Sequence, residues 1–146
     1  MDKIEALVEK LRDKDDNAAY DALQRLLAES RASARVLPFL PDFFSLLAAP
    51  SAYLRTRGLL LVCANARWDA AGLIEEKLPL LLAHITDEKP AVARQFVRAL
   101  PELAQAKPQC VPAIRQALLA ADLSAYRESM RPLIEKDIQA ALTALG

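Results

Sequence analysis

The strongest constraint on the fold is the spacing of apolar residues, which recur with a period close to 3.6 along nearly the whole chain. This is the period of an α-helix that turns one face inward. Ile4, Leu7, Val8 and Leu11 form the first such stripe, and the polar run 13–17 interrupts it. Ala and Leu dominate the composition, and three glycines are too few for a turn-rich β protein. The chain is therefore predicted to be all-α.

Turn and capping residues divide the pattern into eight predicted helices, arranged as four pairs with short loops. Pro50 ends one helix, and Ser51 is a good N-cap for the next. Pro90 suits the first position of another helix, and the last helix is expected to begin near Ser124. We expect a single domain over residues 1–146. Its approximate units are residues 1–30, 31–67, 72–106 and 108–144.

Prolines recur inside the first helix of three pairs, and an arginine follows each of them by 14 or 15 residues. These are Pro41 with Arg55, Pro79 with Arg94, and Pro112 with Arg127. Because the three coincidences are in phase with the helix pairs, they indicate a repeat array. In such an array each pair buries its apolar faces on its neighbours, and the second helices line the inner surface.

The segment LPLLLAHITDEKPAVARQFVRALPELA, residues 78–104, resembles a HEAT repeat. That family has a proline in the first helix, an aspartate in the turn and an arginine early in the second helix. Pro79, Asp87 and Arg94 occupy these places, with Arg94 one position late. The resemblance extends over residues 34–135. It implies a right-handed α-α superhelix of about four HEAT-like helix pairs.

A closer resemblance covers almost the whole chain. YLRTRGLLLVCANARWD (53–69), DEKPAVARQ (87–95) and SAYRESMRPLIEKDI (124–138) resemble a family of small bacterial helical-repeat proteins. Some members carry a name borrowed from the Suf-type iron–sulfur assembly proteins, which are β-rich. Cys63 and Cys110 form no CxxC pair, and the chain has one histidine, so a set of metal ligands is lacking. The resemblance implies a fold and no reaction, and we expect no cofactor and no metal.

The arginines of the inner helices have two expected roles. In HEAT-like arrays the early arginine of an inner helix pairs with a turn aspartate, a role that the resemblance implies for Arg55, Arg94 and Arg127. Asp87 is the expected partner of Arg94 or Arg55, so Arg55 and Asp87 are predicted to lock the repeat. Trp68 is expected to cap the core between repeats, with an exposed, partner-binding position as the alternative. Arg57 points about 200° away from Arg55 on a helix, so one of the two arginines should be exposed. The candidate partner-binding residues on the concave face are Arg57, Arg94, Gln95, Arg98, Arg127 and Arg131.

Three further residues interrupt predicted helices. Gly58 costs about 1 kcal/mol relative to Ala within a helix, so we expect a neighbouring helix to approach closely there. Pro101 and Pro132 are expected to kink inner helices.

Like charges at i,i+4 spacing, as in the arginine pairs of the last two inner helices, repel slightly. An acidic residue or an anionic partner should compensate for them.

No motif of a known catalytic class is present: the sequence has no Gly-rich phosphate loop, no GxSxG and no HExxH. We therefore expect a non-enzymatic interaction or scaffold module that presents its concave surface to a protein or peptide, as a monomer or weak homodimer. The alternative is nucleic-acid or phosphate-backbone binding through the inner arginines, as in HEAT-like DNA glycosylases. The net charge is zero, and neither a membrane-spanning run nor a signal peptide is recognised, so a cytoplasmic location is expected.

Overall fold

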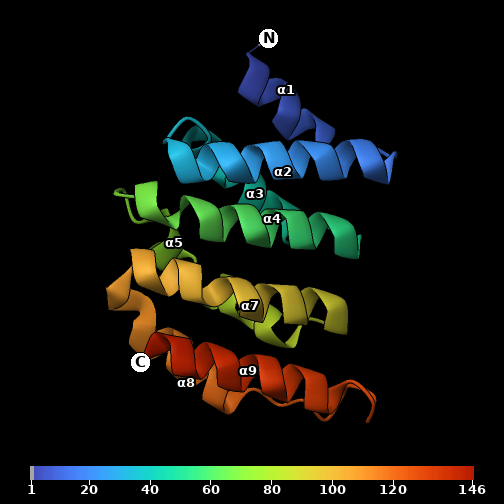
Figure 1. Cartoon of the computed structure of the whole chain (residues 1–146), viewed down its shortest axis with the longest axis vertical. Coiled ribbons are helices and arrows are strands. Elements are labelled where there is room, and N and C mark those ends of the chain that lie inside the picture. Colours follow the sequence, from blue (N-terminus) through green and yellow to red (C-terminus); the bar gives the residue numbers. More distant parts are fainter. Residues whose placement is uncertain (1) are drawn as a thin grey trace. The chain divides into compact units, whose positions relative to one another are not determined.

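The computed structural model describes residues 2–146, which form nine α-helices and four short 3-10 turns without a strand (Figure 1). The all-α class predicted from the sequence is confirmed. The elements are α1 (Lys3–Lys10), α2 (Asp16–Ala32), η1 (Leu37–Phe39), α3 (Leu40–Leu46), α4 (Ala52–Asn65), η2 (Ala66–Trp68), α5 (Leu73–Glu76), α6 (Leu78–Leu82), η3 (Ala83–Thr86), α7 (Pro90–Ala106), η4 (Pro108–Cys110), α8 (Val111–Ala120) and α9 (Arg131–Leu145).

The chain divides into two compact units, one that ends at Ala70 and one that runs from Ala71 to Gly146. The boundary lies between the second and third predicted repeat units. The first unit contains α1 to α4, in which α1 packs on α2 and α3 packs on α4. The second contains α5 to α9, in which α7 packs on η3 and α8 packs on α9. Each unit thus consists of two helix pairs.

The first unit is organised by α2 and α4, the blue and green helices that lie side by side in Figure 1. Ser51 is the N-cap of α4, as predicted, and its hydroxyl accepts a hydrogen bond from the Leu54 amide at 3.4 Å. Leu26 of α2, Phe43 of α3 and Leu61 of α4 are fully buried. Removing such side chains from water is the main favourable contribution to folding.

Gly58 lies where α4 meets α3, and the close approach expected from the sequence is confirmed. A Cβ atom at Gly58 would lie 2.6 Å from the carbonyl oxygen of Phe43 and 2.9 Å from the Cβ of Leu46. Both distances are shorter than van der Waals contact allows. Only glycine fits this crossing, which explains why a residue that weakens an isolated helix is placed inside α4.

The three repeated prolines begin α-helices and do not lie within longer ones, so the prediction of one continuous first helix in each pair is wrong. Pro41, Pro79 and Pro112 occupy the first turns of α3, α6 and α8. A short helical turn precedes each of these helices, namely η1, α5 and η4. Proline has no N–H to donate and clashes with the carbonyl four residues earlier, so the helix restarts at the proline.

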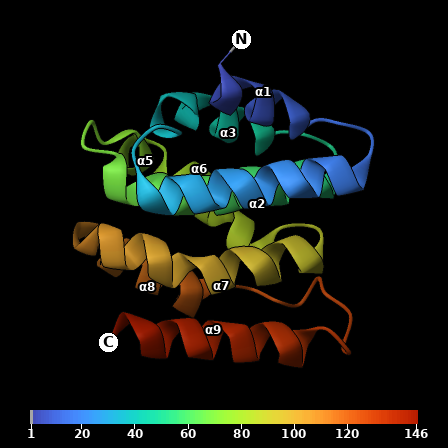
Figure 2. The ribbon, with the colours of Figure 1, turned by 45° about the horizontal axis from the view of Figure 1, so that its top comes forward.

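The second unit is organised by α7 and α9, which lie side by side in both views (Figures 1 and 2). Pro90 is the first residue of α7, as predicted, and Pro101 lies inside the same helix. Phe96 and Leu100 of α7 and Ile134 of α9 are fully buried between the helices of this unit. The two cysteines are also buried, one in each unit. Among the described residues, no helix combines the length and the apolar character needed to cross a bilayer.

The segment 121–130 forms turns, so the predicted start of the last helix near Ser124 is wrong. The Asp122 carboxylate accepts a hydrogen bond from the Ser124 amide at 3.0 Å, which holds a local turn. Tyr126 is buried, and its hydroxyl donates to a backbone carbonyl 39 residues away. These bonds replace the helical ones, and α9 begins only at Arg131. Pro132 therefore lies in the first turn of α9 and interrupts no helix.

Candidate interaction surface

Arg57 is a structural residue of the first unit. Its Nη1 donates to the Leu11 carbonyl oxygen at 2.8 Å, and its Nη2 lies 3.5 Å from the Asp16 carboxylate. The guanidinium also lies 5.7 Å from the centre of the Tyr53 ring. Arg55 and Arg57 are only 6% and 7% exposed. Neither side chain is exposed, so the prediction that one of the two is exposed is wrong. The reason is that Arg57, on α4, is held between the end of α1 and the start of α2.

Arg55 closes the turn that leads from α3 into α4. Its Nη1 donates to the carbonyl oxygens of Ala49 at 3.1 Å and Pro50 at 2.8 Å. These carbonyls follow the end of α3 and have no helical partner, so the guanidinium compensates for the missing bonds. A locking role within the helix pair is thus visible. A pairing of Arg55 with Asp87 would join the two units and stays a prediction.

Trp68 joins the two helix pairs of the first unit. Its indole Nε1 donates to the Ser30 carbonyl oxygen at 2.6 Å, near the end of α2. Asn65 donates to the Ser30 hydroxyl at 3.0 Å and to the Leu61 carbonyl at 2.9 Å. The indole is half-buried, and its N–H is bonded within the unit. These bonds link the end of α4 to the end of α2.

Asp87 fixes the turn before α7 with both oxygens of its carboxylate. One carboxylate oxygen accepts from the Lys89 amide at 2.9 Å, and the other lies 2.8 Å from Nδ1 of His84. The Tyr126 hydroxyl donates to the Asp87 backbone carbonyl. Burial and the nearby Asp87 carboxylate raise the pKa of Tyr126 to about 12. Asp87 therefore connects the turn before α7 with the segment 121–130.

Arg94 and Arg98 share one carboxylate, that of Asp137 on α9. The Arg94 Nε donates to Oδ2 at 2.7 Å, and the Arg98 Nε donates to Oδ1 at 3.3 Å. The hydrogen bond to Asp137 raises the pKa of Arg94 above its usual value. The acidic residue expected to compensate for two arginines on one helix face is therefore Asp137, and Arg94 pairs with it and not with Asp87.

The other predicted partner-binding residues of the second unit lie in two places, on α7 and near the start of α9. Gln95 is exposed on α7, as is Lys136 on α9, and the Arg98 side chain is 56% exposed. We call the surface of Arg94, Gln95, Arg98 and Asp137, together with Lys136, which adjoins Asp137 in the sequence, the α7–α9 face. It carries three cations and one carboxylate, a formal charge of +2.

Arg127 and Arg131 do not form the predicted pair on one helix face, because Arg127 lies in the turn segment before α9. Arg127 is exposed. The Arg131 Nε donates to the Tyr126 carbonyl at 2.8 Å, and its Nη2 donates to the Ser124 carbonyl at 3.0 Å. Arg131 therefore holds the turn segment against the start of α9 and has a structural role.

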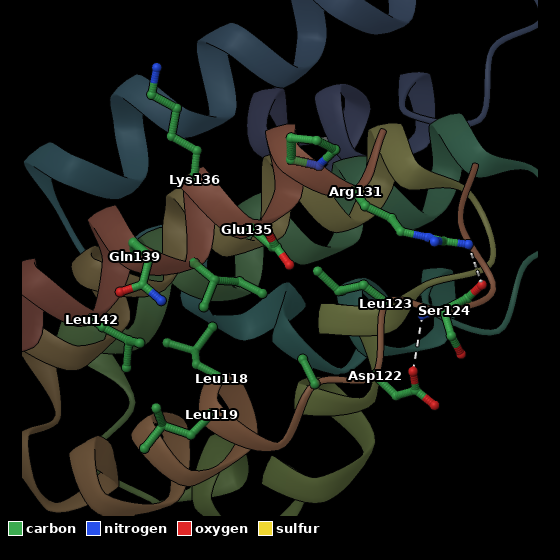
Figure 3. A pocket seen from close by; sticks show the side chains of 13 residues that line it. Leu118, Leu119, Asp122, Leu123, Ser124, Arg131, Glu135, Lys136, Gln139 and Leu142 are labelled. Atoms are coloured by element: carbon green, nitrogen blue, oxygen red, sulfur yellow. Dashed lines mark hydrogen bonds between the residues drawn. The ribbon is translucent and has the colours of Figure 1, made fainter. Parts of the chain in front are cut away.

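A groove of about 900 Å³ lies between α8, α9 and the turn segment (Figure 3). The sequence did not indicate it, because a helix starting near Ser124 would have left no turn segment to form its third wall. Its apolar lining comes mainly from Leu118, Leu119, Leu123, Ile138 and Leu142. Its polar lining consists of Asp122, Ser124, Arg131, Glu135, Lys136 and Gln139. We call it the α8–α9 groove.

An ion pair between the buried Lys107, at the end of α7, and the half-buried Glu75 of α5 was also not foreseen. The Lys107 Nζ lies 2.5 Å from one oxygen of Glu75, and Gln109 donates to the other at 2.9 Å. The hydrogen bond from Lys107 is the main reason why the pKa of Glu75 is lowered from its usual value. No local pattern marks this pair, because its partners lie 32 residues apart in the sequence.

The described residues contain no group of three or more His, Cys, Asp or Glu side chains placed to hold a metal ion. Comparison of the chain with protein-family models, with curated proteins and with solved structures gave no match.

Proposed function

We propose that the protein is a non-enzymatic interaction module of the α-solenoid type, which binds a protein or peptide through the α7–α9 face. Its four helix pairs would form the right-handed superhelix implied by the resemblance to HEAT repeats. The support is that each unit consists of two helix pairs, with the long second helices α2 and α4, or α7 and α9, side by side.

The carrying observation is the single carboxylate shared by two arginines. Asp137 accepts one hydrogen bond from each of Arg94 and Arg98, and each guanidinium has five N–H donors. Most donors of the exposed Arg98 side chain are therefore available to a ligand. With Lys136 nearby in sequence on α9, the face has a formal charge of +2. An acidic segment of a protein partner complements this charge, and charge-assisted hydrogen bonds to arginine are strong and directional.

The experiment is an affinity capture from the source cells, followed by titration of the captured partner. The double variant Arg98→Glu with Lys136→Glu reverses the charge of the face and leaves the Arg94–Asp137 bond in place. Binding should weaken by about tenfold or more, since mutating interfacial charges lowers association rates and affinity. The matched control is Arg12→Glu with Lys14→Glu, which reverses an exposed arginine and an exposed lysine of the first unit.

A partner that binds wild type, the α7–α9 variant and the control equally would contradict the proposal. Titration with duplex DNA at two salt concentrations separates the nucleic-acid alternative. Of the five arginines in the predicted binding set, Arg57 is buried, Arg94 is paired with Asp137, and Arg131 donates to backbone carbonyls. We therefore expect weak DNA binding. Tight binding with a steep salt dependence would assign the face to phosphate groups instead.

A further inference from the structure

The Arg98 side chain is held by one atom of its guanidinium. Its Nε donates to Oδ1 of Asp137 at 3.3 Å, and this is the side chain's one hydrogen bond within residues 2–146. The two Nη nitrogens carry the other N–H donors of the guanidinium. Because the side chain is 56% exposed, these donors are accessible to a ligand from solution.

Arg94 holds the same carboxylate from the preceding turn of α7. Its Nε lies 2.7 Å from Oδ2 of Asp137, and its side chain is 24% exposed, less than half the exposed fraction of Arg98. A short, charge-assisted hydrogen bond of this kind is strong. The Asp137 side chain is itself only 11% exposed. Arg94 and Asp137 therefore join α7 to α9, and Asp137 in turn fixes the direction of Arg98.

Charge distinguishes Arg98 from an arginine with similar geometry in the first unit. Arg25 of α2 donates through Nε to Asp21 at 2.8 Å, and its side chain is 61% exposed. The Arg25 pair is neutral, whereas the α7–α9 face has a formal charge of +2, or of +1 when Glu102, one turn after Arg98, is also counted. An anion in solution is therefore attracted to the surroundings of Arg98 more than to those of Arg25.

We propose that Arg98 selects the partner by binding one carboxylate of the partner's acidic segment with both Nη nitrogens, while its Nε stays bonded to Asp137. The inference rests on the proposed function and names the group that the α7–α9 face recognises. The two Nη nitrogens form a planar fork that matches the two oxygens of a carboxylate. A lysine ammonium has the same charge and no such fork, so the shape of the guanidinium contributes to the selection as well as its charge.

The test is the binding of fluorescein-labelled hexaglutamate to the full chain, followed by fluorescence anisotropy at low ionic strength. Wild type should bind the peptide. Arg98→Lys should raise the dissociation constant by about fivefold or more, because the charge is kept and the fork is lost. The matched control is Arg25→Lys, which makes the same change at an exposed arginine of the first unit and should leave the dissociation constant unchanged. Circular dichroism confirms that both variants fold.

The possible results separate this inference from the proposed function. If Arg98→Lys binds hexaglutamate as tightly as wild type, and Arg98→Glu with Lys136→Glu does not bind it, the face recognises charge alone. The inference is then overturned, and the proposed function is supported. If wild type and the charge-reversed variant bind the peptide equally, or if neither binds it, both proposals are overturned.

Two further results overturn the inference alone. One is a loss of affinity in Arg25→Lys that equals the loss in Arg98→Lys, because the effect is then not specific to the α7–α9 face. The other comes from competition with a short DNA duplex. If the duplex displaces hexaglutamate at a concentration far below the dissociation constant of the peptide, the group that Arg98 selects is a phosphate and not a carboxylate.

Discussion

At the scale of single residues, arginine side chains close turns in this protein by donating to backbone carbonyl groups. Arg55 bonds the carbonyls after α3, Arg57 bonds the carbonyl of Leu11, and Arg131 bonds two carbonyls of the turn segment. Short helices leave many carbonyls without an intrahelical partner. A guanidinium, with five donors, satisfies several of these groups at once. These arginine bonds therefore offset a cost that comes with short helices.

Replacement of Arg57 should show how much one such bond contributes. Arg57→Met replaces the guanidinium by an apolar side chain of similar length. The carbonyl of Leu11, a fully buried residue, then loses its hydrogen-bond donor. We expect the free energy of unfolding to fall by about 1–3 kcal/mol, measured by urea denaturation. Arg25→Met is the matched control, since Arg25 also pairs with an aspartate but is exposed. It should change stability by less than about 0.5 kcal/mol. Equal effects would show that burial of Arg57 contributes nothing.

Gly58 provides a second test, because helix propensity and packing make opposite predictions. Alanine is favoured over glycine in a helix by about 1 kcal/mol. Its Cβ, however, would lie 2.6 Å from a backbone oxygen of α3. We expect the steric cost to exceed the gain, and Gly58→Ala to destabilise the protein by about 1–3 kcal/mol in urea denaturation. A more stable variant would mean that α3 moves away easily. Gln24→Ala, at an exposed site on α2, should be nearly neutral.

At the scale of elements, the Lys107–Glu75 pair fixes α5 against the end of α7 and makes the second unit sensitive to acid. The pKa of Glu75 is lowered from 4.5, so the folded state favours the carboxylate. This stabilisation is complete above pH 4.5 and is lost as the pH falls through the lowered pKa. Wild type should therefore lose more stability below pH 4.5 than Glu75→Gln does.

The measurement for Glu75 is the melting temperature as a function of pH. At pH 7, Glu75→Gln should melt at a lower temperature than wild type, and the two curves should converge as the pH falls toward 3. Glu76→Gln is the control, because Glu76 is the adjacent exposed carboxylate. Its curve should remain parallel to that of wild type. Parallel curves for Glu75→Gln would show that the ion pair does not contribute to folding.

The sequence predicts elements well where local signals decide them. Apolar spacing locates the long helices, and Ser51 and Pro90 mark two of their starts correctly. The turn segment 121–130 is missed because tertiary bonds decide it: Tyr126 donates to a carbonyl 39 residues away. Local propensity carries no information about a partner at that distance, and tertiary contacts override it.

The candidate site follows the same rule. Periodicity correctly predicts that Arg94 and Arg98 share a helix face, because an i,i+4 spacing is a local property. Their common acid, Asp137, lies 43 and 39 residues away. The sequence indicates that an acid is needed and does not identify it. The burial of Arg57 is missed for the same reason, since its acceptor Leu11 is 46 residues away.

At the scale of the whole molecule, the division into two compact units predicts two unfolding steps. Trp68, the only tryptophan, lies in the first unit, so its fluorescence reports that unit alone. Phe96→Ala opens the core of the second unit and should destabilise it by about 3–5 kcal/mol. For this variant, circular dichroism should show a transition at low urea concentration in which Trp68 fluorescence changes only slightly.

Phe43→Ala, in the core of the first unit, provides the reciprocal variant. It should shift the transition seen by Trp68 fluorescence to lower urea concentration. The unfolding of the second unit, followed by circular dichroism, should change less. If fluorescence and circular dichroism instead move together in both variants, the two units unfold as one cooperative structure, and the division is only geometric.

The sharing of Asp137 by two arginines has a consequence for how fast complexes form and separate. An acidic ligand that reaches Arg98 meets a guanidinium that already has an anionic neighbour. The Asp137 carboxylate offsets part of the positive charge that such a ligand meets, so each new contact is weaker than one with an unpaired guanidinium. Such recognition is expected to be short-lived and sensitive to ionic strength, as in transient signalling encounters.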